Sequence, residues 1–254
     1  MGKIITITIR KGGSGKTSTA VNLASGLAKQ GKKVLLVDLD SQANAGIALG
    51  VADDVNNIAT VLGGKDINEA IRQVGDLYLV PSSNDLSGYE SQLTANSDLY
   101  AIKDRLDPIK NDYDYIILDT PPSDGIMTRN ALVASDYALI PAQAQTFAIK
   151  GLQQALELTQ TIIDKYNPNL KLAGILPTMW QGNTNVGNLF IEQLKDEYKD
   201  KLLPFSIPLT IKVTESQLVG QPILDYDPSH PTSKIYLDLA NYIINLNEGN
   251  QNEQ

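Results

Sequence analysis

Short apolar runs recur along the chain, and segments with helical periodicity separate them. The runs are ITITI, KKVLLVDLD, DLYLVPSS, DYIILDTPPS, YALIPAQ and LKLAGILPT. They are mostly β-branched or apolar, which is typical of parallel strands that are buried on both faces. The pattern predicts a doubly wound α/β fold, in which helices cover both faces of a mostly parallel sheet. In such folds ligands bind at the carboxyl ends of the strands.

The segments between the runs carry apolar residues at helical spacing. In the first of them Ala20, Leu23 and Leu27 share one face, and Gly31 follows where a helix commonly ends. The predicted helices are Thr17–Gln30, Leu99–Ile109, Ile126–Ala134, Ala148–Tyr166, Val186–Tyr198 and Thr232–Leu246. No repeat or proline-rich linker divides the chain, so we expect one domain over residues 1–246. The polar segment 247–254 is expected to be a disordered tail.

Composition narrows the chemistry that the protein can perform. The chain has 254 residues, of which 42% are hydrophobic, so it can bury a sizeable core. It contains no cysteine and one histidine, His230, which excludes disulfides, iron–sulfur clusters and histidine-rich metal sites. The formal net charge of −8 argues against a basic surface that binds nucleic acid everywhere. Any DNA contact must therefore come from a local patch.

The start of the chain runs directly into a strand-like segment, without a basic and apolar leader. No apolar stretch approaches the roughly 20 residues that span a bilayer. We therefore expect a soluble, cytoplasmic protein.

The stretch RKGGSGKTST, residues 10–19, lies between the first predicted strand and the first predicted helix. It ends in GKT as a phosphate-binding loop requires, although the common pattern G-x-x-x-x-G-K-[ST] has glycine where this chain has Arg10. Its glycines let the backbone curl around phosphate oxygens, and the helix N-terminus adds to the affinity for anions. In such a loop Lys16 reaches the β- and γ-phosphates, and the Thr17 hydroxyl is the one protein group that coordinates Mg²⁺ directly. The residues expected to bind nucleotide here are Lys11, Gly12, Gly13, Ser14, Gly15, Lys16, Thr17 and Ser18.

Two other apolar runs end in acidic residues. VLLVDLD ends in Asp38 and Asp40, and YIILDTPPS carries Asp119. A single aspartate after a strand is usually a turn former, but three of them together with a phosphate loop fit a Mg²⁺ and water-orienting set better. We expect Asp119 to contact Mg²⁺ through water and Asp40 to orient the attacking water. Asp38 is expected to support both, as part of the nucleotide and metal site.

These motifs resemble those of the ParA/MinD family. RKGGSGKTS is similar to its deviant Walker A loop, in which a lysine precedes the glycine pair, and ILDTPPS is similar to its Walker B motif. VDLDSQAN resembles the second motif of the family, with Ser41 where proline is usual. The segments LVPSSNDLSGYE, PAQAQTFAIKGLQQ and GILPTMW, and residues 211–243, resemble later parts of ParA-type, Soj-like partition ATPases. The likeness therefore covers nearly the whole chain.

The resemblance implies a P-loop ATPase fold and a role in trans for Lys11. In the family the lysine at this position reaches across a dimer interface to the partner's phosphates, where a cation from each side offsets the repulsion between two nucleotides. The implied catalytic residues are Lys11, Lys16 and Asp40. Mg²⁺-dependent hydrolysis of ATP is expected to be slow, because no arginine finger is evident.

The resemblance also places an adenine pocket and raises a question about one lysine. Thr178, Met179 and Pro208, the last near a later strand, correspond to the family's base pocket, so ATP is favoured over GTP. A role for Met179 in apolar packing is the alternative. Lys150 is either a phosphate or interface contact or a solvated residue at the start of a helix.

The implied function is that of a partition ATPase that moves or positions a cargo. Such a protein forms an ATP-dependent homodimer, binds DNA without sequence specificity, and is stimulated to hydrolyse ATP by a ParB-like or cargo-adaptor protein. It would be associated with the nucleoid, and no membrane partner is expected. For DNA contact we favour Lys212 over Lys199, Lys201 and Lys195, because Lys195 and Lys199 can equally pair with acidic neighbours on their own helix. The sequence leaves open whether the cargo is a plasmid, a chromosome region or an organelle.

Three other functions fit parts of the pattern. A MinD-like membrane ATPase needs a basic amphipathic C-terminal helix, and this chain has no lysine after Lys234. An organelle-positioning relative is disfavoured because that branch is thought to lack the lysine found here at Lys11. A P-loop metabolic synthetase, similar to dethiobiotin synthetase, shares the fold but has no need of Lys11. Iron proteins of the nitrogenase type are excluded by the missing cysteines.

Overall fold

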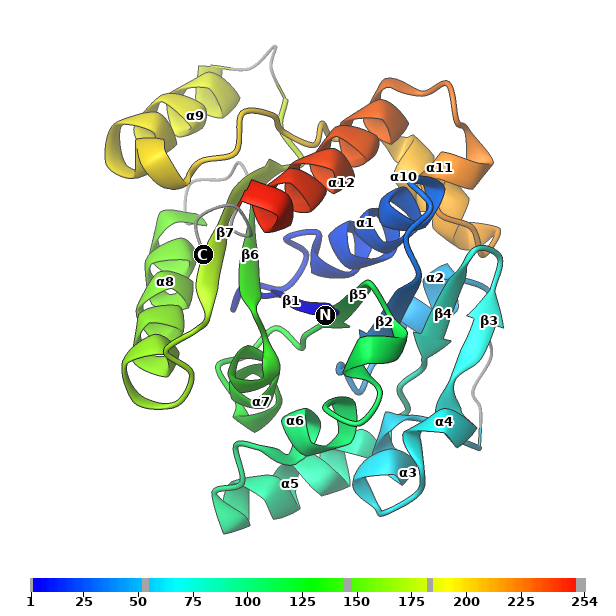
Figure 1. The fold of residues 1–254 in the computed structure, drawn as a ribbon. Coiled ribbons are helices and arrows are strands. Elements are labelled where there is room, and N and C mark those ends of the chain that lie inside the picture. The colour runs from blue at the N-terminus through cyan, green and yellow to red at the C-terminus, as the bar shows by residue number, and fades with distance from the viewer. Residues whose placement is uncertain (1, 52–54, 144–147, 182–184, 250–254) are drawn as a thin grey trace.

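The computed structural model describes residues 2–51, 55–143, 148–181 and 185–249, and these form a single sheet with helices on both faces (Figure 1). The order of the strands in the sheet is β3-β4-β2-β5-β1-β6-β7, and every neighbouring pair is parallel except β3 and β4. The strands are β1 Lys3–Ile7, β2 Val34–Asp38, β3 Arg72–Val74, β4 Leu77–Val80, β5 Tyr115–Asp119, β6 Tyr137–Gln143 and β7 Lys171–Thr178. The predicted doubly wound α/β fold is confirmed, with a short antiparallel edge strand, β3, that the sequence analysis did not include.

The six predicted helices are all present, and further short helices lie between them. The predicted ones correspond to α1 Lys16–Lys29, α6 Ala101–Leu106, α7 Ile126–Ala134, α8 Ala148–Lys165, α9 Asn185–Tyr198 and α12 Pro231–Gly249. The additional ones are α2 Asn44–Ala48, α3 Ile58–Leu62, α4 Ile67–Ala70, α5 Leu86–Asn96, α10 Ile211–Leu218 and α11 Ile223–Tyr226, with 3-10 turns at Lys110–Asp112 and Lys199–Lys201. Helix α12 continues into the segment expected to be a tail, and residues 250–254 lie outside the described residues. The domain boundary and the tail therefore stay predictions.

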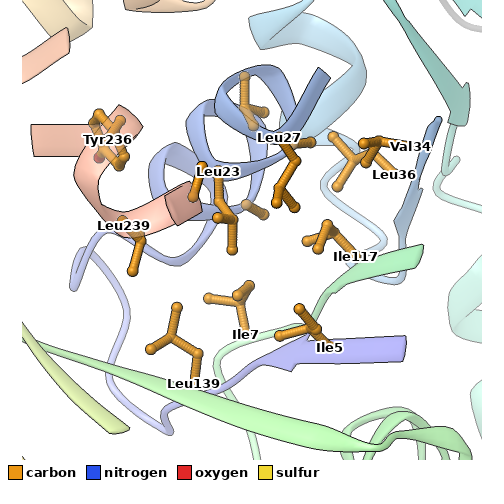
Figure 2. Packing of buried hydrophobic residues seen from close by; sticks show 14 of the residues in the cluster. Ile5, Ile7, Leu23, Leu27, Val34, Leu36, Ile117, Leu139, Tyr236 and Leu239 are labelled. Carbon is orange, nitrogen blue, oxygen red and sulfur yellow. The ribbon is translucent and has the colours of Figure 1, made fainter. Parts of the chain in front are cut away.

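Successive residues of each central strand face opposite sides of the sheet, which explains why the strands are apolar throughout. Ile5 and Ile7 of β1 pack with Leu23 and Leu27 of α1 on one face (Figure 2). Ile4, the residue before Ile5, belongs to the core on the other face, which α3 to α7 cover. Because both faces are buried, the sheet is a rigid base whose carboxyl edge holds the loops in place.

Helix α1 is held against α12 by a close contact at Gly26. A Cβ atom at this position would lie 3.0 Å from the carbonyl oxygen of Tyr236 and 3.2 Å from the Cβ of Ala240. The end of α1 has the geometry of a Schellman motif: the N–H of Gly31 donates to the carbonyl of Ala28 at 2.9 Å, and Gly31 has a φ of 75°. The helix therefore ends where the sequence predicts.

Two glycines join the region after β2 to the C-terminal part of the chain. Gly50 follows α2 and Gly220 follows α10, and a Cβ on Gly220 would lie 2.7 Å from the Cα of Gly50. Both glycines have left-handed backbone, with φ of 69° and 70°. Only residues without a Cβ allow the two segments to approach this closely.

Of the helices described, none is long and apolar enough to cross a bilayer.

Candidate nucleotide-binding site

The carboxyl ends of three central strands meet at one edge of the sheet. In the β2–β5 register Asp38 is opposite Asp119, and in the β1–β5 register Ile7 is opposite Asp119. The loop that follows β1 is the glycine-rich stretch of residues 10–15, so the strand register alone brings this loop beside both acidic strand ends. The sequence analysis expected this arrangement.

The glycine-rich loop has left-handed backbone at Gly13 and Gly15, with φ of 69° and 85°. Its interior is held by polar contacts to the Lys11 carbonyl, which accepts from the Ser14 hydroxyl at 3.0 Å and from the Lys16 ammonium at 3.3 Å. Because these φ values favour glycine, substituting either residue would strain the curl of the loop. The loop then continues without a break into α1, whose N-terminus points at the space that the loop encloses.

A cavity of about 380 Å³ opens beside this loop. Its lining comprises Gly12, Gly13, Ser14, Gly15, Lys16, Thr17, Ser18, Asp40, Gln42, Asn44, Ile47, Ala48, Pro122, Met179 and Gln217. Seven consecutive residues of the loop and of the first turn of α1 therefore face one space, together with Asp40. Their chemistry, a row of backbone N–H groups with one lysine and three hydroxyl side chains, suits a chain of phosphates.

Asp38 and Asp40 differ in what their carboxylates contact. Both oxygens of the fully buried Asp38 accept backbone hydrogen bonds, from the N–H of Asp40 at 3.0 Å and from that of Ala45 at 2.9 Å. Asp40 accepts one bond, from the N–H of Gln42 at 3.0 Å, and lines the cavity. Asp38 thus fixes the loop that carries Asp40, and Asp40 is the carboxylate that faces the cavity.

Asp119 is fully buried, and within the part of the chain that the structure describes neither of its carboxylate oxygens has a hydrogen-bond partner. Burial raises the pKa of Asp119 to about 7, although the neighbouring Thr17 side chain and the charge of Lys16 act in the opposite direction. Burial also raises the pKa of Asp38, to which the negative charge of Asp119 adds. The charge of Lys16 therefore offsets the effect of burial on Asp119 only in part.

Lys16 lies close to these carboxylates but is itself almost fully buried. Burial lowers the pKa of its ammonium group, which Asp119 and Asp40 partly restore. The described residues include no group of three or more histidine or acidic side chains that could hold a metal ion by themselves. A metal at this edge would therefore be held largely by water and by a ligand's own oxygens, with Thr17 as the nearest hydroxyl of the loop.

A second cavity of about 190 Å³ adjoins the first. The three residues expected in a base pocket all line it: Thr178, Met179 and Pro208. The Thr178 hydroxyl donates to the Ser14 carbonyl at 2.8 Å, which ties this cavity to the phosphate loop. Met179 has left-handed backbone with a φ of 51°, which is uncommon for a residue other than glycine.

The sequence analysis placed Pro208 near a later strand, and in the structure it lies beside the end of β7. In the described part of the chain Pro208 makes only an isolated β-bridge with Trp180. The N–H of Trp180 donates to the Ile207 carbonyl, and the N–H of Leu209 to the Trp180 carbonyl. Residues 203–210 contain two prolines, which cannot donate to a sheet ladder, and the segment forms no continuous strand beside β7.

The lysines expected at the mouth of the site lie on two elements. Lys11 is partly buried and near the start of α8, since its Cβ is 3.9 Å from where a Cβ on Gly151 would be. Lys150, the preceding residue on α8, is exposed. Arg10 is 3.4 Å from a carboxylate oxygen of Asp124, which links the entrance of the phosphate loop to the loop after β5.

The lysines predicted to contact DNA are not gathered on one patch of the protomer. Lys195, on α9, and Lys199 and Lys201, in the following 3-10 turn, are exposed. Lys212 lies in the first turn of α10, where its ammonium group is 2.8 Å from Glu215. Figure 1 shows α9 and α10 well apart, with α12 between them.

The sequence analysis missed three polar residues that line the cavity beside the phosphate loop. Gln42 and Asn44 follow Asp40, and Gln217 lies on α10. Nearness in sequence to the VDLDSQAN motif could have indicated the first two. Gln217 carried no signal, because α10 itself was not predicted.

Comparison with known proteins agrees with the geometry. A family profile described as an AAA domain matches residues 2–172. Sporulation initiation inhibitor protein Soj of Bacillus subtilis is 41% identical over 246 residues, which cover 94% of this chain and 97% of that protein. Chromosome partitioning protein ParA of Myxococcus xanthus is 37% identical over 247 residues, which cover 94% of this chain and 87% of that protein.

Solved structures show the same likeness. Cobyrinic acid a,c-diamide synthase from Mycobacterium smegmatis with bound ADP and magnesium has a TM-score of 0.83 at 30% identity, covering 96% of this chain and 94% of that one. A putative plasmid partition protein from Borrelia burgdorferi bound to AMPPNP has a TM-score of 0.81 at 28% identity. The match covers 96% of this chain and 99% of that one. With relatives above 30% identity that span nearly its full length, the chain belongs to the ParA/MinD family of ATPases and is of the Soj/ParA partition type.

Proposed function

We propose that this ATPase binds Mg²⁺-ATP across the two cavities, dimerises on it, and hydrolyses it slowly to release DNA and a cargo. The observation that carries the proposal is the cavity beside the phosphate loop, where Lys16 and Thr17 lie next to the buried, unpartnered carboxylate of Asp119. The relatives named ParA and Soj support partition as the purpose of the cycle. The structures crystallised with ADP, AMPPNP and magnesium support the choice of ligand.

The residues at the site fit a magnesium ion. A carboxylate that is buried without a hydrogen-bond partner is unfavourable unless a cation or its water shell completes it. The Thr17 hydroxyl would contact the metal directly, and Asp119 would hold a metal-bound water, with Asp38 restricted to fixing the Asp40 loop by its two backbone bonds. When bound, Mg²⁺ neutralises negative charge on the phosphates.

Asp40 is the proposed water-orienting residue, because it is the acidic side chain that lines the cavity. No arginine of the described residues lines that cavity, and an arginine finger contributes about 10³ to 10⁵ in rate where one exists. A slow intrinsic rate follows, and the proposed cycle assigns a partner protein the role of raising it. An Asp40→Ala variant is expected to bind ATP and form the dimer while losing hydrolysis.

The dimer is the part of the proposal that light scattering can test directly. Wild-type protein should convert from monomer to dimer when Mg²⁺-ATP is added. Lys11→Ala should block that conversion while ATP binding falls by much less, because Lys11 is proposed to act on the partner's phosphates. Lys16→Ala should lose ATP binding itself, since Lys16 serves the phosphates of its own chain.

Lys150→Ala is the matched control for this experiment. It removes the same charge from the neighbouring element, but the proposal gives Lys150 no phosphate to contact. It should therefore dimerise like the wild type. An unchanged ATP-induced dimer in Lys11→Ala would contradict the role in trans, and failure of Lys150→Ala as well would mean that general charge, rather than Lys11, drives assembly.

A metabolic synthetase is the second candidate, and the similarity to a cobyrinic acid a,c-diamide synthase favours it. A synthetase consumes ATP only when its acid substrate is present, and it has no need of a lysine acting between subunits. Hydrolysis of ATP and ATP-dependent assembly by the purified chain alone would support the partition cycle. A chain that stays monomeric with ATP and turns over only with an added carboxylic acid would support the synthetase.

A further inference from the structure

Gln217 lies at the junction of the two cavities. The residues that line both of them are Gly15, Ser18, Met179 and Gln217. A nucleotide that occupies both cavities has its sugar between the phosphates and the base, so the sugar passes beside these residues. Of the four, only Ser18 and Gln217 have side chains that form strong hydrogen bonds.

The two side chains are already joined to each other. The Gln217 side-chain N–H donates to the Ser18 hydroxyl oxygen at 3.0 Å. This bond leaves the amide oxygen of Gln217 as an acceptor and the proton of the Ser18 hydroxyl as a donor. An acceptor beside a donor matches a vicinal diol, in which each hydroxyl can give or accept a hydrogen bond.

The helix that carries Gln217 is fixed at both ends. Thr210 caps the start of α10, accepting a hydrogen bond from the N–H of Lys212 at 3.2 Å. The buried Ser216, next to Gln217, donates to the Val213 carbonyl at 2.9 Å. Gly220, just beyond the helix, lies against Gly50. Gln217 is therefore held in place before a ligand arrives, and little ordering is needed on binding.

We propose that Gln217, together with Ser18, binds the ribose hydroxyls and makes the site prefer ribonucleotides to deoxyribonucleotides. The inference rests on the proposed function, because it requires ATP to span the two cavities. A missing sugar hydroxyl leaves the half-buried amide without its partner, and sites built to bond a hydroxyl reject analogues that lack it. Contacts to the phosphates and to the base alone cannot make this distinction.

Calorimetric titration with ATP, 2′-deoxy-ATP and 3′-deoxy-ATP in the presence of Mg²⁺ tests the proposal. The wild type should bind ATP about 3- to 10-fold more tightly than at least one deoxy analogue, the factor expected for one net hydrogen bond. Gln217→Leu should remove most of this preference. The ratio of ATP to GTP affinity should not change in Gln217→Leu, because the base is proposed to contact Thr178, Met179 and Pro208, and a general collapse of the site would change it.

Two further variants sharpen the result. Gln221→Leu makes the same substitution on an exposed residue just beyond α10 and should behave as the wild type. Gln217→Glu keeps an acceptor oxygen and should keep the preference for ATP over the deoxy analogue, even if its charge weakens all nucleotides. Equal binding of ATP and both analogues by the wild type, or an undiminished preference in Gln217→Leu, would overturn the proposal. Failure of the proposed function looks different, because the wild type would then bind no ATP.

Discussion

At the scale of single residues, Asp119 combines full burial with a carboxylate that has no partner among the described residues. Its pKa is about 7 in the folded protein against an ordinary value of 3.8, so the folded state holds the proton more tightly than the unfolded state. A group with a raised pKa stabilises the fold in full below about pH 4, and this contribution is lost as the pH rises through about 7. Asp38, whose pKa burial also raises, acts in the same direction.

We therefore expect the free energy of unfolding of the nucleotide-free protein to fall between about pH 4 and pH 7. At about 1.4 kcal/mol per pKa unit, the loss from Asp119 is a few kcal/mol at most. Asp119→Asn should flatten this slope and be more stable than the wild type at pH 8. Urea unfolding at several pH values, with a metal chelator present, measures how the free energy of unfolding depends on pH. Asp200→Asn, at an exposed position, is the control. A slope that Asp119→Asn leaves unchanged would contradict the assignment.

The sequence indicated which acidic and loop residues lie at the carboxyl edge of the sheet, but not what their side chains contact. The phosphate loop is a local feature, so its glycines, Lys16 and Thr17 can be recognised from spacing alone. The contacts of Asp38 depend on backbone N–H groups of a turn and a short helix whose geometry spacing does not specify. Gln217 lies 199 residues from its partner Ser18, and no local pattern connects the two.

At the scale of elements, predictability followed the length and amphipathicity of each segment. Helix α1 was predicted to within one residue at each end, because apolar spacing and Gly31 agree. Helices α2, α3 and α4 have five residues or fewer, too short to show a period. Helix α5 fully buries only Leu86 of its 11 residues, and Tyr89 and Leu93 are partly buried against the same core, so its apolar face is narrow. Strand β3 escaped notice although Gly75 and Asp76, which form its two-residue turn to β4, are a hairpin signal.

The contact between α1 and α12 leads to a prediction about stability. Gly26→Val adds a branched side chain where the Tyr236 carbonyl oxygen already lies 3.0 Å from an added Cβ. We expect it to lower the free energy of unfolding by about 1 to 3 kcal/mol, as overpacking commonly does. Gly88→Val, on the exposed α5 where an added Cβ meets nothing within 4 Å, is the control and should be neutral or slightly stabilising. Thermal unfolding compares the pair, and equal melting temperatures would show that α12 yields at this contact.

At the scale of the whole molecule, the acidic net charge must be reconciled with the proposed DNA binding. Lys212 is 39% exposed at its side chain, but its ammonium group is engaged with Glu215 at 2.8 Å, and the hydroxyl of Tyr226 also donates to Glu215. A DNA phosphate would compete with that carboxylate. Because α9 and α10 lie apart on one protomer, a continuous basic track would require both subunits of a dimer.

We predict that the ATP-loaded protein retains random-sequence duplex DNA at low salt and releases it steeply as salt rises. Lys212→Ala should weaken binding uniformly across sequences, and Glu215→Gln should strengthen it by removing the competing charge. Lys65→Ala, which removes an exposed lysine near the distant α3 and α4, is the control for net charge. Fluorescence anisotropy over a salt series measures all four proteins. Loss of binding in Lys65→Ala to the same extent, or an ATP dimer that retains no DNA at low salt, would contradict this surface.

The meeting of Gly50 and Gly220 has a mechanical consequence. Asp40, proposed to orient the attacking water, lies on the segment that leads into α2 and Gly50, while α10 carries both Gln217 and Lys212. Where side chains separate two elements, small displacements are absorbed by rotamer changes, but here one main chain rests directly on the other. No side chain lies between the two segments to absorb a displacement. A shift of the segment that carries Asp40 would therefore be passed on to α10 almost undiminished.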